Sequence, residues 1–291
     1  MHLCVTIAFQ DRLRSRRDDC HLPQSETPCP SLRIKAPNYI GMNKASENLF
    51  CSSWASAIPP TCGIAAARFL PTVIAPSLLD NRGVGQSDVT PGIYSIALMA
   101  SDAAAVLHAA GVESAHVFGV SMGGMIAQEF ALQYPNRVRS LILGCTAAGG
   151  PHAVQAESAA LQTLMRRDLT PEESKEAIIP FIYDAATSRE RIDEDMAIRM
   201  KWFPTPQGYA GQLQGIFGWE AYSRIAQTTA PTLVIHGETD RLIPPANSQL
   251  IAERIPGAKL VLIPHASHIF ETDQPSAAHH AILGFLADQP T

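Results

Sequence analysis

Hydrophobic and polar residues follow different patterns on the two sides of about residue 69. Beyond that point, short continuous apolar runs alternate with stretches in which apolar residues recur every three or four positions. The continuous runs predict buried strands at 72–79, 115–120, 138–145, 231–237 and 259–264, although Pro76 is unexpected inside a strand. The periodic stretches predict helices at 95–111, 122–135, 245–255 and 276–288.

Strands that are apolar along their whole length and alternate with helices are typical of a parallel sheet. We therefore predict an α/β fold with a mostly parallel sheet and helices on both faces. Residues 150–226 interrupt the alternation with mainly helical patterns, and the stretch TPEE from Thr170 has the cap, proline and acids of a helix start. We expect a core of residues 69–149 and 227–291, with 150–226 inserted in it as a helical cap.

The opening of the chain, residues 1–68, has neither helical nor strand periodicity. It also holds five of the six cysteines, which are Cys4, Cys20, Cys29, Cys51 and Cys62. We expect this stretch to be an atypical N-terminal region, either disordered or translated in a shifted reading frame.

Composition excludes several classes of protein. The chain has 291 residues, of which 46% are apolar and 17% charged, as in globular proteins. Its net charge of −5 and lack of a basic block argue against nucleic acid as a partner. No apolar run is long enough to span a membrane, and no signal peptide is expected. The cysteines lack metal-binding spacing, which favours a reduced, cytoplasmic setting without disulfides.

Candidate chemistry begins at Ser121, which lies between Gly119 and Gly123. A strand that runs straight into a helix must turn sharply at this serine, so the backbone is strained and the flanking positions have no room for side chains. The turn exposes the hydroxyl and directs the backbone N–H of Met122 to the same point. That arrangement suits a nucleophile with half of an oxyanion hole. The alternative is a glycine-rich turn that binds phosphate or merely packs.

A serine nucleophile needs a base, and the base needs an orienting acid. Asp240 follows the strand predicted at 231–237, and His265 and His268 follow the strand at 259–264. In a parallel sheet both loops open at the edge where Ser121 lies, and the order Ser, Asp, His suits this arrangement. Glu238 is the nearest rival of Asp240, which could instead cap a turn. The other histidines, among them His236 at a strand end, are expected to be structural or on the surface.

Five successive stretches resemble the α/β-hydrolase fold family over about seven-tenths of the chain. They are DNRGVGQSD, GVSMGGMIAQE, YPNRVRSLILGC, PTLVIHGETDRLIPP and PHASHIF. The branch that they resemble comprises serine esterases, enol-lactonases and cofactor-free haloperoxidases. The resemblance implies Ser121 as nucleophile, Asp240 as orienting acid, His268 rather than His265 as base, and no metal or organic cofactor. A serine nucleophile argues against the dehalogenase and epoxide hydrolase branches, which use aspartate.

The chain departs from the family pattern before the DNRG loop. Members have an apolar strand that ends in His-Gly, and the following loop supplies a second oxyanion donor. Here Glu47 and Asn48 stand where His-Gly is expected, which makes Leu49 the candidate for that second N–H. No apolar run precedes it, so the sequence predicts a gap in the sheet, poor solubility and weak activity.

We therefore predict a serine hydrolase that cleaves a carboxylic ester or lactone of a small, largely apolar acid through an acyl-enzyme. The same triad would also serve a cofactor-free haloperoxidase or perhydrolase, in which peroxide replaces water. A non-catalytic protein of hydrolase fold, impaired by its divergent N-terminus, is the alternative from another class. The oligomeric state and the individual substrate have no readable signature in the sequence.

Overall fold

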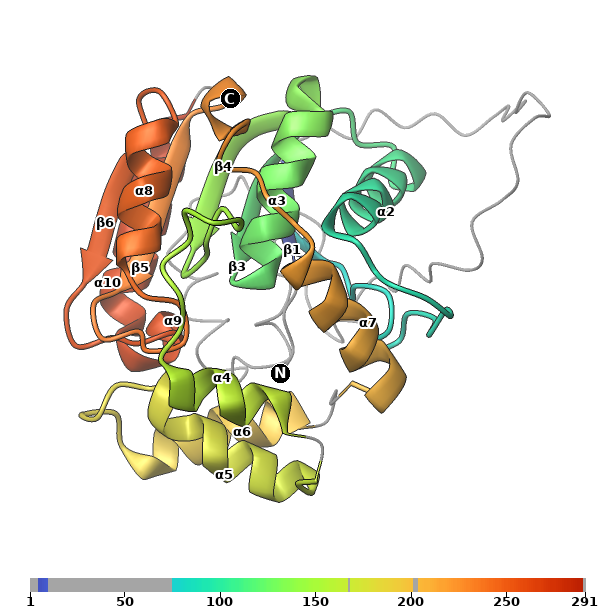
Figure 1. Ribbon diagram of the computed structural model, residues 1–291. Coiled ribbons are helices and arrows are strands. Elements are labelled where there is room, and N and C mark those ends of the chain that lie inside the picture. The colour runs from blue at the N-terminus through green and yellow to red at the C-terminus, as the bar shows by residue number, and fades with distance from the viewer. Residues whose placement is uncertain (1–4, 10–74, 167, 201–203, 290–291) are drawn as a thin grey trace, which may run out of the picture.

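A computed structural model describes residues 5–9, 75–166, 168–200 and 204–289, and its centre is a sheet (Figure 1). Its six strands lie in the order β2-β1-β3-β4-β5-β6. The strands are β1 Val5–Phe9, β2 Ala75–Leu78, β3 Ala115–Val120, β4 Val138–Gly144, β5 Thr232–Gly237 and β6 Lys259–Ile263. Strands β3 to β6 are mutually parallel, whereas β1 pairs antiparallel with both β2 and β3. The predicted α/β class with a mostly parallel sheet is confirmed.

Helices cover both faces of the sheet because its inner strands are apolar on both sides. Val117 and Leu141 belong to a core cluster shared with α2 Ile96–Ala109, α3 Met122–Gln133 and α8 Ala246–Arg254. Their neighbours Phe118 and Ile142 point the other way, into a cluster shared with α10 Pro275–Ala287. Successive strand residues therefore fill two separate cores.

The N-terminal part of the sheet differs from the prediction. Val5–Phe9 form an inner strand, so the expectation that residues 1–68 supply no strand is wrong for these five residues. The short run VTIAF has no pattern that indicates its two partner strands, because both are supplied by distant residues, in β2 and β3. Strand β2 is the outermost of the described strands, and an edge position tolerates Pro76, which lacks an N–H.

Between β4 and β5 the residues that the structure describes form four α-helices. They are α4 Ser158–Met165, α5 Pro171–Ile182, α6 Arg189–Met200 and α7 Pro206–Phe217. Figure 1 shows α4, α5 and α6 grouped beyond the ends of β3 and β6, apart from the helices that cover the sheet. The expected helix start at Thr170 is a complete capping box, in which its side chain and that of Glu173 exchange bonds with backbone N–H groups.

Short elements complete the connections. They are the 3-10 turns Pro135–Arg137 and Ile225–Gln227 and the helix α9 Phe270–Asp273. Ile269, next to α9, packs with Ile178 and Ile182 of α5 and with Ile192 of α6. The helical group is therefore attached to the loop that follows β6. In the described part of the chain, no helix is both long enough and apolar enough to span a membrane.

Candidate active site

The sharp turn predicted at Ser121 is present. This residue joins β3 to α3 with φ 59° and ψ −124°, a left-handed backbone that is costly for any residue with a side chain. A Cβ atom on Gly119 would lie 2.1 Å from the carbonyl oxygen of Gly123, so the strand and helix can approach only because a glycine is there. Met122 is the first residue of α3, and its N–H has no acceptor inside the helix.

Two contacts from β4 and its following loop hold the turn in place. The Ser121 N–H donates to the carbonyl of Gly144 at 2.8 Å, and the Thr146 hydroxyl donates to the Ser121 carbonyl at 2.7 Å. A Cβ on Gly124 would lie 2.5 Å from the Cβ of Thr146, so this glycine leaves room for the threonine. The pairing of Gly124 with Thr146 has no signal in the sequence, because no local pattern relates two residues 22 positions apart.

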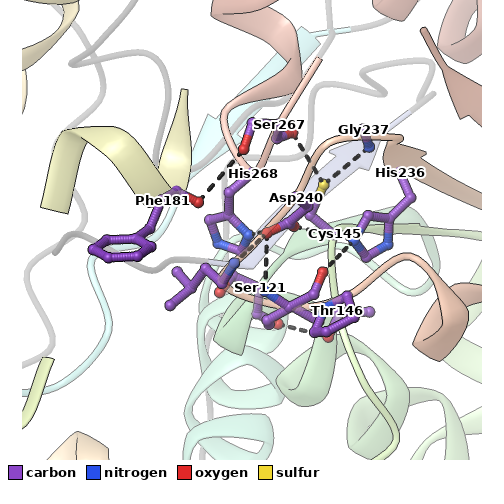
Figure 2. A network of polar contacts seen from close by, with 12 residues as sticks. Ser121, Cys145, Thr146, Phe181, His236, Gly237, Asp240, Ser267 and His268 are labelled. Carbon is purple, nitrogen blue, oxygen red and sulfur yellow. Dashed lines mark hydrogen bonds and ion pairs between the residues drawn. The ribbon is translucent and has the colours of Figure 1, made fainter. Parts of the chain in front are cut away.

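Asp240 and His268 meet as the sequence predicted. His268 Nδ1 lies 2.7 Å from Asp240 Oδ2, and both side chains are buried. The other carboxylate oxygen, Oδ1, accepts the backbone N–H groups of Leu242 and Ile243, each at 2.9 Å. Figure 2 shows Ser121, Asp240 and His268 gathered together. The buried Nε2 of His268 has no hydrogen-bond partner among the described residues.

The electrostatics of the site favour an ionised Asp240. Burial alone would raise its pKa, but the charge of His268 and the hydrogen bonds from His236 and His268 outweigh burial and hold the pKa well below the usual range. Because an ionised carboxylate can only accept hydrogen bonds, Nδ1 of His268 must carry a proton and donate the hydrogen bond to Asp240. In the neutral ring Nε2 is then the basic nitrogen.

The rival residues lie elsewhere. His265 is exposed and has φ 56°, and Glu238 is exposed beside β5. Neither makes a hydrogen bond to Asp240 or His268. The second oxyanion donor that the sequence indicated, Leu49, lies outside the described residues.

A second histidine, His236, contacts the same aspartate. It is fully buried at the end of β5, with Nε2 3.0 Å from Asp240 Oδ2 and Nδ1 2.5 Å from the Ser248 hydroxyl. The sequence alone predicts a structural role for His236, and its position four residues before Asp240 is the one signal in the sequence that suggests the contact. Cys145 lies nearby, where burial and then the Asp240 charge raise the pKa of its thiol well above the usual range.

The loop that carries His268 is anchored by a buried carboxylate. Asp273 Oδ2 accepts the N–H of Ser267 at 2.7 Å and that of Asp184 at 3.1 Å, while Oδ1 accepts the Thr187 hydroxyl at 2.5 Å. Burial raises the pKa of Asp273 to about 6, although these hydrogen bonds act in the opposite direction. The carboxylate thus joins the histidine loop to the segment between α5 and α6.

A cavity of about 310 Å³ includes Ser121 in its wall. Most of its lining is apolar and comes from α3, α4, α7 and the segment after β4, for example Met125, Leu161, Leu213, Ile216 and Trp219. The polar groups of two lining residues are bound to backbone, since Gln212 donates to the Arg82 carbonyl and Tyr209 to the Leu164 carbonyl. None of the described residues that line the cavity is charged.

Comparison with known proteins places this fold in a family. Residues 77–271 match the model of a family described as "alpha/beta hydrolase fold". A protein named "Putative carbamate hydrolase RutD" from Azorhizobium caulinodans is 33% identical over 217 residues, or 72% of this chain and 80% of its own. The 3-oxoadipate enol-lactonase 2 of Acinetobacter baylyi is 31% identical, over 70% of this chain and 75% of its own.

A solved structure is similar in both sequence and fold. The crystal structure of a hydrolase from Pseudomonas aeruginosa PA01 is 31% identical, with a TM-score of 0.62 over 72% of this chain and 79% of its own. The family match covers well over half of the present chain. The chain therefore belongs to the α/β-hydrolase fold family and is an enzyme of the hydrolase type.

Proposed function

We propose that the protein hydrolyses a carboxylic ester or lactone through an acyl-enzyme formed on Ser121. The observation that carries this proposal is the state of His268, whose Nδ1 is fixed on Asp240 while its buried Nε2 has no partner among the described residues. A basic nitrogen held in this way, beside a serine in a strained turn, is the arrangement that activates a hydroxyl. The enol-lactonase relative is consistent with such a reaction.

The proposed reaction has two halves. Nε2 of His268 takes the Ser121 proton as Oγ attacks the substrate carbonyl, and the Met122 N–H at the start of α3 donates to the developing oxyanion. The imidazolium, stabilised by Asp240, then gives its proton to the leaving alkoxide, and the acyl group remains on Ser121. Water, deprotonated by the same nitrogen, attacks the acyl-enzyme, and Ser121 recovers its proton as the acid leaves.

The cavity indicates the kind of acyl group. Its described lining offers apolar side chains and no charge, and the amide of Gln212 already donates to backbone. A carboxylate or ammonium group in such a pocket would lose its hydration without gaining a partner. We therefore propose a neutral, largely apolar acyl group, in contrast to the charged acid implied by the adipate in the name of the enol-lactonase relative.

A fluorophosphonate probe tests the nucleophile directly. We expect stoichiometric labelling, with the adduct located by mass spectrometry on the peptide that contains Ser121, and none in Ser121→Ala. The control is Ser276→Ala, a change of the same kind at an exposed serine of α10, which should label like the wild type. Unlabelled wild-type protein, or an adduct on another residue, would refute the proposal and favour a non-catalytic protein.

A panel of p-nitrophenyl esters then tests the acyl group. We expect kcat/KM to rise with chain length over the first few carbons, since each added methylene gains apolar contact in the cavity. Succinyl or glycyl esters of similar size, which carry a charge, should react at least about tenfold more slowly. Equal rates for charged and neutral esters would contradict the proposed apolar pocket while leaving the nucleophile intact.

A further inference from the structure

The carboxylate of Asp240 is shared between two imidazole rings. Figure 2 shows Asp240 between His268 and His236, and the two rings contact the same oxygen, at 2.7 Å and 3.0 Å. All three side chains are buried. We propose that His236 is a positioning residue of the reaction, which acts by donating an N–H to Asp240 and so fixing the acid that orients His268. The inference rests on the proposed function.

The neighbours of His236 determine which nitrogen carries its proton. Nε2 faces only acceptors, namely Asp240 Oδ2 and the Ile243 carbonyl at 2.8 Å. It must therefore be protonated and donate. Nδ1 faces the Ser248 hydroxyl, which can donate to it, so a neutral ring satisfies every partner. The structure thus assigns the Nε2–H tautomer to His236 and the Nδ1–H tautomer to His268.

With this assignment the carboxylate of Asp240 accepts four N–H groups. Oδ1 holds the backbone N–H groups of Leu242 and Ile243, and Oδ2 holds the two rings. Four donors on two sides prevent the carboxylate from rotating. Without His236, Oδ2 would keep only the bond to His268, and both the position and the basicity of the carboxylate would change.

The loss of this donor has a predictable electrostatic effect. A carboxylate that shares its charge with fewer donors stabilises the His268 imidazolium more strongly, so the acid limb of the pH profile of kcat/KM should move to higher pH. The Cys145 thiol also lies within 4.8 Å of an Asp240 carboxylate oxygen, but burial raises the pKa of this thiol well above its usual range, so it stays neutral at the pH of the assay. A shift in the acid limb of the pH profile therefore reports on the contact between Asp240 and His268.

Two amides distinguish positioning from packing. His236→Gln places an N–H near the location of Nε2 and can still donate to Asp240. His236→Asn reaches only the location of Nδ1, where it can contact Ser248 but not the carboxylate. We expect His236→Asn to lower kcat about 10- to 100-fold with KM little changed, and to raise the acid-limb pKa of kcat/KM by roughly 0.5 unit. His236→Gln should keep kcat within a few-fold of the wild-type value and leave the acid limb of the pH profile of kcat/KM unshifted.

His116 provides the matched control. It is also a buried histidine at a strand, with Nδ1 2.8 Å from the Ser140 hydroxyl, but no hydrogen bond links it to Asp240. His116→Asn should lower the melting temperature and leave kcat and the pH profile per labelled site unchanged. If His236→Asn and His236→Gln behave alike, or if His116→Asn reproduces their effect, His236 is structural and the inference is wrong.

A measurement on the wild-type enzyme covers the case in which His236→Asn does not fold. ¹⁵N NMR of histidine-labelled protein should show one buried ring protonated on Nε2 and its neighbour protonated on Nδ1, with the first signal lost in His236→Gln. A His236 ring protonated on Nδ1 alone would overturn the inference. Failure of the proposed function has a different signature, because fluorophosphonate labelling of Ser121 would then be absent in the wild type itself.

Discussion

The two ends of the site are built in different ways. At the proposed reacting end, hydrogen bonds hold the backbone of Ser121 and the side chains of Asp240 and His268, and four nitrogen atoms contact the Asp240 carboxylate. At the proposed acyl-binding end, α4 and α7 supply apolar surface, and the side-chain amide of Gln212 donates to a backbone carbonyl. Activity at the first end depends on the positions of a few hydrogen-bonded atoms. Binding at the second end depends on the volume of the cavity and on its apolar lining.

This difference determines how strongly a substitution at each end is expected to change activity. When several groups act as one unit, the loss of any one of them removes most of the catalysis. One substitution at the reacting end should therefore lower kcat by orders of magnitude. Apolar contacts are many and individually weak, and one methylene more or less in an apolar pocket changes selectivity by about 10- to 200-fold. The following predictions test that contrast, from the largest effect to the smallest.

Replacing the nucleophile should have the largest effect. Ser121→Ala leaves no group in the turn that can form an acyl-enzyme, so we expect ester hydrolysis to fall about 10³-fold or more. Steady-state assays with the best ester of the panel measure it, and binding of a non-hydrolysable analogue shows that the acyl-binding end remains intact. Turnover comparable to wild type would end the serine-nucleophile mechanism.

The base should be almost as sensitive as the nucleophile. His268→Ala removes the nitrogen that takes the serine proton, and we expect a loss similar to that of Ser121→Ala because the two act as one unit. The matched control is His265→Ala, three residues earlier and exposed, which should change kcat/KM less than about tenfold. A larger loss at His265 than at His268 would reverse the assignment of the base.

Much of the reacting end could be predicted from the sequence, for a physical reason. Strand β3 was expected at 115–120 and is Ala115–Val120, and β5 and β6 lie within one residue of their predicted bounds. In a parallel sheet, strand order along the chain brings the following loops to one edge, so Ser121 and His268 could be placed without coordinates. Local signals sufficed because each residue is positioned by its own strand end.

The remaining features depend on contacts between distant segments. The place of Thr146 beneath Ser121 and the second contact of Asp240 with His236 follow from packing, which no local pattern records. The same holds for β1, whose five residues pair with β2 and β3 against the prediction of a gap. The cavity is lined by α3 and by Leu242 and Ile243 after β5 as well as by residues within 147–219, so its shape could not be inferred from the helical pattern of residues 150–226.

At the acyl-binding end, one substitution should alter selectivity rather than rate. Leu213 of α7 lines the cavity, and Leu213→Trp reduces the volume for long acyl chains. We expect the ratio of kcat/KM for octanoyl over butanoyl esters to fall about tenfold, with butanoyl turnover nearly unchanged. The control is Gln214→Trp, the neighbouring exposed position on α7, which should leave the ratio as in the wild type. An equal loss of kcat/KM for both esters would mean that Leu213 does not contact the acyl chain of the substrate.

The smallest effect on rate should come from a buried carboxyl group outside the reacting end. Glu271 is buried in α9, and its Oε2 has no hydrogen-bond partner among the described residues. Burial raises its pKa from 4.5 to about 8, against the opposing charge of Arg199, while Asp195 raises it further. The folded state therefore favours the protonated carboxyl, and the stability it provides is complete below about pH 4.5 and lost as the pH rises through 8.

Glu271→Gln mimics the protonated form at every pH. Because the variant has no charge to bury, its melting temperature should exceed that of wild type at pH 9, by about 2–4 °C for each kcal/mol recovered, and differ little at pH 5. The control is Glu253→Gln, an exposed carboxylate on α8, which should leave the pH dependence unchanged. Ester turnover at pH 7 should change less than about threefold, since Glu271 makes no hydrogen bond to Ser121, Asp240 or His268. A variant less stable than wild type at pH 9 would show that the charged form of Glu271 is stabilised in the fold.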